Sequence, residues 1–278
     1  MTKGVLLIGY GTRKGNLEEI LGRQLARLEA RGRDRVYLAY FRVSEPSIED
    51  ALRRMAADGV DEVLAVPYYI AEGRLTYELI PGKMGVPIGG NGETVVDGRK
   101  VRVSMSPAFG MTRVLFNILC DRIAESGCGK DDGILVIGHG SRDVSSSNRA
   151  IIAMNADRLR KIGYSHVAYA FNEFDEPAIG DAVSGLVSEG VEKIAVLPLF
   201  IAMGVHLCEE VAEKIGIPPY SDGGDIDAGG RKVSVRYMRP VEDDPRPLEL
   251  INSEIADFYR DLNEGSHSPY CARGQGPR

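Results

Sequence analysis

The 278-residue sequence has few cysteines, no long apolar run and no basic run. Its four cysteines show no metal-type spacing and are too few for a disulfide framework in a chain of this length, so we expect free thiols in a reducing compartment. No stretch of eighteen apolar residues is present to cross a membrane, and the apolar strand directly after Met1-Thr-Lys-Gly is unlike a signal peptide. These absences predict a cytoplasmic protein with no membrane partner.

A nucleic-acid partner and a nucleotide cofactor are disfavoured on similar grounds. The formal net charge is −6, whereas binding to phosphates needs a positive surface. The glycine turns Gly9-Tyr-Gly11 and Gly138-His-Gly140 lack the Gly-x-Gly-x-x-Gly spacing, and no acidic residue closes the segment Tyr40-Phe-Arg42. A nucleotide-binding oxidoreductase is therefore disfavoured, and we expect no nucleotide or redox cofactor.

What is present is a tandem duplication. The segment 58–67, Asp-Gly-Val-Asp-Glu-Val-Leu-Ala-Val-Pro, returns at 189–198 as Glu-Gly-Val-Glu-Lys-Ile-Ala-Val-Leu-Pro, a shift of 131 positions. Shorter matches follow that shift to within one residue: Glu45-Pro-Ser-Ile with Glu176-Pro-Ala-Ile, and Gly98-Arg-Lys-Val with Gly230-Arg-Lys-Val. The duplication predicts two domains, 1–130 and 131–262. The Gly-, Ser- and Pro-rich segment 263–278 is predicted to be a disordered tail.

Each repeat alternates apolar strands with amphipathic helices. Strands are expected at 4–9, 35–41, 62–67, 100–106, 133–138, 167–172, 193–200 and 232–238, and helices at 17–30, 48–57, 112–126, 148–161, 179–189 and 248–262. Because the strands are rich in Val, Leu and Ile without alternation, they should be buried on both faces, as in parallel sheets between helices. The polar loops 89–97 and 221–229 are interpreted as connectors. The sequence therefore predicts two α/β units, each with a mainly parallel four-stranded sheet.

The repeats differ most at the ends of their strands, where open α/β sheets bind ligands. At the shift of the duplication, Tyr10 becomes His139, Leu75 becomes His206 and Arg42 becomes Glu173. Two imidazoles and a carboxylate suit Fe²⁺, Co²⁺, Ni²⁺ or Zn²⁺, so we predict a metal site in the second repeat alone. The remaining histidines, His166 and His267, are expected to be structural or exposed.

Two neighbouring residues leave alternatives open. Glu176 suits the first turn of a helix, where an acidic residue is favoured, and its counterpart Glu45 is retained in the repeat without histidines. Cys208 lies two residues beyond His206 and could supply a soft ligand, or it could pack on the surface of a helix. Glu173 is therefore the carboxylate that we expect to face the metal.

Three ordered motifs of the second repeat carry a family resemblance. Gly-His-Gly-Ser-Arg follows its first strand, Phe-x-Glu-Phe-x-Glu-Pro its second, and Pro-x-Phe-x-Ala-x-Gly-x-His its third. Together they resemble the class II chelatases of the sirohydrochlorin cobaltochelatase type, in the long form with two repeats. That resemblance implies flavodoxin-like, chelatase-like units and a lyase that inserts a metal ion into a tetrapyrrole in cobalamin or related biosynthesis.

The resemblance also implies roles for individual residues. His139 would bind metal and accept a pyrrole proton, and His206 would be the second metal-binding histidine. The residues expected to contact the tetrapyrrole are Glu176, Ile201, Ala202, Met203, Gly204, Val205 and His206, with Arg142 as a cation for its carboxylates. The metal is predicted to be Co²⁺, with Ni²⁺ or Fe²⁺ as alternatives, and a non-catalytic carrier of metal or tetrapyrrole is the rival hypothesis. The chain would be a monomer or a homodimer, with its two repeats imitating a short-form dimer.

Overall fold

The computed structural model describes residues 1–260, except for the side chain of His206. The predicted tail, 263–278, and His267 lie outside the described residues. The described chain forms two compact α/β units. The first comprises Met1–Arg13, Leu17–Phe109 and the chain from Asp243 onward, and the second comprises Lys14–Asn16 and Gly110–Glu242. Within residues 1–260 no helix has the length and hydrophobicity that crossing a bilayer requires.

The first unit contains a five-stranded sheet with the order β2-β1-β3-β5-β4, in which only β4 is antiparallel to its neighbour. Its strands are β1 (Lys3–Gly9), β2 (Val36–Tyr40), β3 (Glu62–Pro67), β4 (Gly92–Val96) and β5 (Arg99–Met105). Its helices are α1 (Leu17–Glu29), α2 (Ile48–Ala57), the π-helical segment η1 (Leu75–Leu79), α3 (Ile80–Met84), the 3₁₀ turn η2 (Phe109–Met111) at the boundary of the units, and α8 (Pro245–Arg260).

The second unit repeats this architecture with the strand order β7-β6-β8-β10-β9. Its strands are β6 (Gly133–Gly138), β7 (His166–Phe171), β8 (Lys193–Pro198), β9 (Gly223–Ala228) and β10 (Arg231–Tyr237). Its helices are α4 (Arg113–Ser126), α5 (Asn148–Lys161), α6 (Ile179–Ser188), the π-helical segment η3 (His206–Val211) and α7 (Ala212–Ile215). The compact units do not coincide with the repeats. Lys14–Asn16 and α4, from the first repeat, belong with the second unit, and α8, from the second repeat, belongs with the first.

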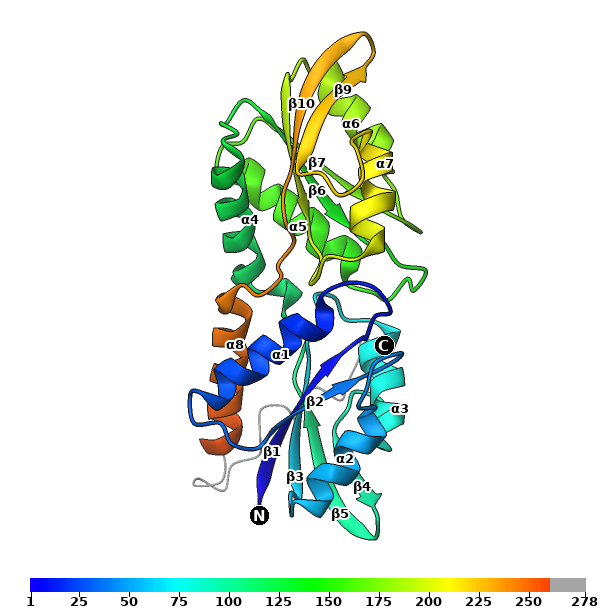
Figure 1. The fold of residues 1–278 in the computed structure, drawn as a ribbon, viewed down its shortest axis with the longest axis vertical. Coiled ribbons are helices and arrows are strands. Elements are labelled where there is room, and N and C mark those ends of the chain that lie inside the picture. The colour runs from blue at the N-terminus through cyan, green and yellow to red at the C-terminus, as the bar shows by residue number, and fades with distance from the viewer. Residues whose placement is uncertain (261–278) are drawn as a thin grey trace. The chain divides into compact units, whose positions relative to one another are not determined.

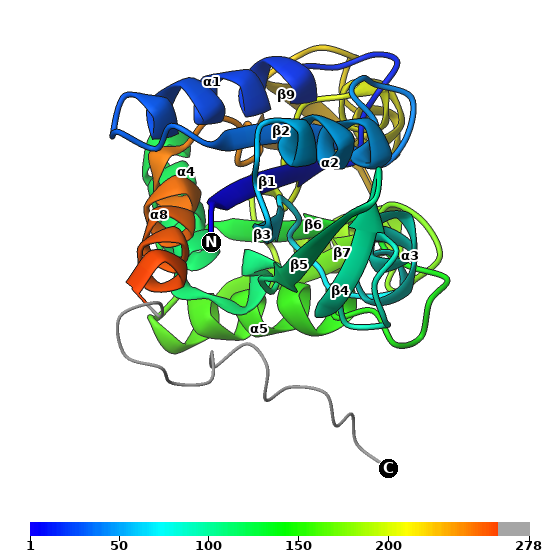
Figure 2. The same cartoon turned by 90° about the horizontal axis from the view of Figure 1, so that it is seen from below.

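Burial on both faces explains why the strands are apolar throughout. Every residue of β1 and of β6 is buried, including Val5–Ile8 and Ile134–Ile137, which are fully excluded from solvent. In the first unit α1 and α8 cover one face of the sheet, and α2 and α3 cover the other (Figure 1). Figure 2 shows the same strands from below, with α8 on one side and α3 on the other. The predicted α/β class and the two-repeat organisation are confirmed.

The prediction of four strands per sheet is wrong, because each sheet has five. The polar loops interpreted as connectors contain β4 and β9, which pair with β5 and β10 as antiparallel hairpins. Each hairpin turns through two residues with positive φ, Asp97–Gly98 (47° and 79°) and Gly229–Gly230 (62° and 77°), the conformation that matches the twist of paired strands. The pairs Asp-Gly and Gly-Gly are the signals from which these edge strands could have been predicted.

Candidate functional site

His139 lies at the carboxyl edge of the second sheet, immediately after β6. The strand ladder continues past it, since the Glu173 backbone N–H donates to the His139 carbonyl (2.9 Å) and that of Leu199 donates to Ile137 (2.8 Å). The imidazole is half-buried, and its Nδ1 lies 3.2 Å from the Gly140 carbonyl oxygen. The turn after β6 therefore presents an imidazole beside the ends of both neighbouring strands.

The turn depends on the absence of a side chain at Gly140. Its φ is +85°, and a Cβ there would lie 1.6 Å from the carbonyl oxygen of Glu173, so the ends of β6 and β7 approach more closely than any other residue permits. Asp175 stabilises the same turn. Its carboxylate accepts a hydrogen bond from the Ser141 backbone N–H (3.0 Å) and forms an ion pair with Arg149 (2.9 Å). The loop carrying His139 is thus held by backbone proximity and by a charged side chain.

Two aromatic rings flank the imidazole. The ring centroids of Phe174 and Phe200 lie 6.3 and 6.0 Å from that of His139. The guanidinium carbon of Arg142 lies 4.4 Å from the centroid of Phe174, within the range of a cation–π contact. The site therefore combines an imidazole with apolar ring faces and one exposed cation.

The two predicted glutamates lie beside this turn with different exposures. Glu173 is partly buried and adjoins His139 through its backbone, whereas Glu176 is exposed and lies at the entrance to α6. The helix-start interpretation of Glu176 agrees with that position. The position of Glu173 keeps open the role predicted for it as a metal-facing carboxylate.

The loop after β8 is held by backbone contacts on two sides. Ile201 accepts from the Glu242 N–H (2.7 Å), and Met203 accepts from the Asn16 N–H (3.3 Å). Gly204 forms an antiparallel bridge with Gly15. Ile201, Ala202, Met203, Gly204 and Val205 are all partly buried. The loop is thus ordered by residues distant from it in the sequence.

The second predicted histidine, His206, is the first residue of the π-helical segment η3. Its side chain lies outside the described part of the structure. The following residue is held by Tyr237, whose hydroxyl donates to the Leu207 carbonyl (3.0 Å), and burial raises the pKa of that hydroxyl well above its usual value, so it remains a donor. Single turns of π-helix occur frequently at functional sites.

Polar side chains also join η3 to the end of β7. The buried Asn172 side chain donates to Glu210 (3.3 Å) and accepts from Lys214 (2.8 Å). By contrast, burial and the neighbouring Glu209 raise the pKa of the Cys208 thiol, which disfavours the thiolate needed for a soft ligand. The packed-surface interpretation of Cys208 is therefore the better supported one.

Among the described side chains, which do not include that of His206, no three His, Cys, Asp or Glu residues are grouped closely enough to hold a metal ion. The metal site of His139, His206 and Glu173 thus remains a prediction. His166 is accounted for differently, since its Nδ1 lies 2.6 Å from a Glu189 carboxylate oxygen in a surface pair.

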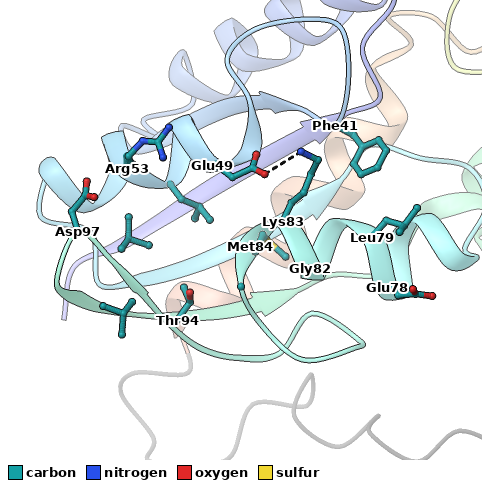
Figure 3. Close-up of a pocket in the computed structure, with 14 residues that line it drawn as sticks. Phe41, Glu49, Arg53, Glu78, Leu79, Gly82, Lys83, Met84, Thr94 and Asp97 are labelled. Atoms are coloured by element: carbon teal, nitrogen blue, oxygen red, sulfur yellow. Dashed lines mark hydrogen bonds and ion pairs between the residues drawn. The ribbon is translucent and has the colours of Figure 1, made fainter.

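A cavity of about 740 Å³ lies in the first unit, away from these residues (Figure 3). It opens between α2, α3 and β4, and its wall includes Phe41 and the ion pair between Lys83 and Glu49 (3.0 Å). A cavity of about 620 Å³ occupies the equivalent place in the second unit, beside Lys214 and Ser184. Because both repeats have this groove between two helices and a hairpin, it is a consequence of the architecture.

The fold is similar to that of two solved structures from Bacillus subtilis. SirB with Fe³⁺ aligns over 96% of this chain and 99% of that one, with a TM-score of 0.72 and 16% identity. The sirohydrochlorin chelatase SirB in complex with cobalt, from subspecies spizizenii, aligns over 96% and 98%, with a TM-score of 0.67 and 15% identity. At these identities the likeness concerns the fold.

Similarity in sequence extends to single-repeat proteins. The sirohydrochlorin cobaltochelatase of Methanosarcina barkeri is 31% identical over 126 residues, which cover 45% of this chain and 95% of that protein. That of Methanococcoides burtonii is 33% identical over 110 residues, covering 39% and 82%. The CbiX family model matches residues 4–126 and again residues 133–258. The resemblance predicted from the three motifs is confirmed, and because the model matches both repeats and most of the sequence, the chain belongs to the CbiX family.

Proposed function

We propose that this chain inserts a divalent metal ion into a tetrapyrrole, with Co²⁺ as the metal and sirohydrochlorin as the macrocycle, as a step in cobalamin or related biosynthesis. The main support is the family match over both repeats together with an imidazole at the carboxyl edge of the second sheet. Ni²⁺ and Fe²⁺ are the alternative metals, and a related tetrapyrrole is the alternative macrocycle.

The chemistry asks for a group that can hold a metal ion and also accept protons. As the ion enters the macrocycle, two pyrrole N–H bonds break, four metal–nitrogen bonds form, and two protons leave. A neutral imidazole has the lone pair needed to bind a metal ion or accept a proton. His139 is assigned both tasks, His206 the second metal contact, and Glu173 the carboxylate that compensates the charge of the ion.

The substrate would contact the groups around His139. Arg142 is exposed on the same turn and would pair with a peripheral carboxylate of the macrocycle. Glu176 and the loop 201–206 would line the remaining contact. Metal insertion exchanges protons for a cation without electron transfer, so the proposed reaction calls for no redox cofactor, and the family resemblance implies no need for ATP.

Absorbance spectroscopy of the full chain with sirohydrochlorin and Co²⁺ tests the proposal directly. We expect the spectrum of the metallated product to appear faster than in the absence of protein, and parallel reactions with Ni²⁺ and Fe²⁺ rank the metals. Rates equal to the uncatalysed reaction with all three ions would contradict an enzymatic role. Retained binding of Co²⁺ or sirohydrochlorin in that case would favour the carrier hypothesis.

A further inference from the structure

We propose that Phe174 is a stacking residue for the tetrapyrrole and determines how tightly the second unit holds the macrocycle. The inference rests on the function proposed above, and it adds a residue to which that function gives no role. Phe174 lies in the turn between β7 and α6, directly before Asp175.

The conformation of Phe174 is unusual for an aromatic residue. Its φ is +63°, in the left-handed region that residues with a side chain seldom adopt, and the residue is 50% exposed. The turn itself imposes this backbone conformation, because Val43 has a φ of +68° at the equivalent position of the first repeat. Core packing does not explain why a large aromatic residue is left half-exposed there, so the exposure of Phe174 is the feature that calls for a role.

The surroundings of the ring indicate what it would contact. Phe174 lies 6.3 Å from the imidazole of His139, between centroids, and carries the guanidinium of Arg142 at 4.4 Å. A ligand that brings its centre to His139 therefore meets an aromatic ring with a guanidinium over one of its two faces. This combination suits a flat conjugated macrocycle with carboxylates on its periphery, because the other face of the ring can stack and the guanidinium can pair with a carboxylate.

The first repeat shows that the turn does not need the ring. Val43 is the counterpart of Phe174, with a φ of +68° and 57% exposure. The same backbone conformation is thus held there by a residue that has no aromatic face. Phe174→Val consequently removes the ring while substituting a side chain that the equivalent turn already accommodates.

Binding measurements on the full chain test this role. For Phe174→Val we expect sirohydrochlorin, titrated by its absorbance, to bind roughly threefold to tenfold more weakly, the range of an aromatic contact. KM for sirohydrochlorin should rise by a similar factor with a smaller change in kcat. Calorimetric affinity for Co²⁺ alone should be unchanged, and Phe174→Tyr should restore wild-type binding.

Tyr164 provides a control in the same unit, since it is also a partly exposed aromatic residue with a cation over its ring, the Lys130 ammonium at 3.6 Å from its centroid. It precedes β7 and therefore lies at the opposite end of that strand from Phe174. Tyr164→Val should leave sirohydrochlorin affinity unaltered. Unchanged affinity in Phe174→Val would overturn the inference, and so would an equal loss of Co²⁺ affinity, which would mean that the ring only orients His139. If the unaltered chain binds sirohydrochlorin but does not insert metal, the proposed enzyme activity fails while the binding test still decides the role of Phe174.

Discussion

The two repeats form the same turn after their first strand and place different side chains on it. Gly11 and Gly140 have φ values of +89° and +85°, and a Cβ on either would lie within 2 Å of the carbonyl of Arg42 or Glu173, respectively. The duplication thus kept the backbone arrangement, whereas the residue before each glycine differs. The scaffold is common to both units, and the predicted chemistry depends on side chains found in only one.

The ends of the second strands differ in a related way. In the second unit Lys214 donates to the backbone and side chain of Asn172, at the end of β7 (2.6 and 2.8 Å). In the first unit Phe41 occupies the equivalent position, and Lys83 instead pairs with Glu49 at the wall of the cavity in Figure 3. Hydrogen bonds from a helix to the end of the second strand are therefore found in the repeat that carries the histidines, where Lys214 of α7 makes them.

The largest expected effect tests whether chemistry is confined to the second repeat. His139→Ala and His206→Ala should each reduce Co²⁺ insertion by about 100-fold or more, the scale of losing a proton-accepting or metal-binding group. Their counterparts Tyr10→Ala and Leu75→Ala should change the rate far less, because neither side chain binds a metal ion well. Initial rates under identical conditions give the comparison, and an equal loss at Tyr10 would show that the first repeat takes part in the chemistry.

The shared turn predicts equal sensitivity in both repeats. Gly140→Ala and Gly11→Ala should each destabilise the fold by about 2–4 kcal/mol, because the new Cβ meets a carbonyl oxygen and the residue must keep a left-handed backbone. Urea unfolding followed by circular dichroism measures this cost. If one of the two substitutions left the free energy of unfolding unchanged, the turn at that position could shift to accommodate the new Cβ, whereas the other turn could not.

Two equivalent positions on α4 and α8, the last helices of the two repeats, should affect the pH dependence of stability differently. Glu254 on α8 corresponds to Arg122 on α4, and burial, assisted by the charge of Asp257, raises the pKa of Glu254 to about 7. The folded state then binds a proton that the unfolded state releases near pH 4.5, so this carboxyl lowers stability as pH rises from about 4.5 to 7. Glu254→Gln should therefore stabilise the protein at pH 8, by about 1–2 kcal/mol after allowance for partial solvation.

The same substitution should have little effect at pH 4.5, and thermal melting at both pH values measures the difference. Arg122 has an opposite environment: its buried guanidinium donates to the carbonyls of Arg239 and Pro240 and pairs with Glu125 (2.9 Å). Arg122→Gln should destabilise the protein at either pH. A stabilisation by Glu254→Gln that is the same at both pH values would contradict a titrating carboxyl at position 254.

The smallest expected effect concerns the support of η3. Tyr237→Phe removes the hydroxyl that donates to Leu207, and the loss of one buried hydrogen bond should cost about 1 kcal/mol of stability. Metal insertion should also slow, since His206 precedes Leu207. Met105, the counterpart of Tyr237, makes no such bond, so Met105→Leu serves as the control. Unchanged activity in Tyr237→Phe would show that this hydrogen bond is not needed to position η3.

Regular elements with a strong local pattern were predictable from the sequence. The helices Ile48–Ala57 and Asn148–Lys161 and the strand Glu62–Pro67 begin and end where they were expected. Their apolar periodicity is a property of neighbouring residues, so it can be recognised without knowing the fold. The edge strands β4 and β9 were missed because they are polar and half-exposed, and their turn residues were the only local signal.

The candidate site was only partly accessible to the same reasoning. The substitution of Tyr10 by His139 was visible because the duplication supplies an internal comparison. Phe174 is a fixed residue of the motif Phe-x-Glu-Phe-x-Glu-Pro, but neither it nor Asp175 was given a role, since a hydrogen bond to a distant turn and the exposure of a ring leave no local pattern. Phe174 could have been noticed as the replacement of Val43, but its ring contacts with His139 and Arg142 depend on the meeting of β6 and β7.

The sequence by itself determined the α/β class, the duplication and the repeat in which the histidines lie, because these follow from periodicity and from matching segments. Only the tertiary structure decided that the last helix of each repeat packs with the other compact unit, and that two rings flank His139. Both are outcomes of long-range packing. Which surfaces meet depends on burying apolar area and pairing backbone groups across the whole chain, and no short stretch of residues records that result.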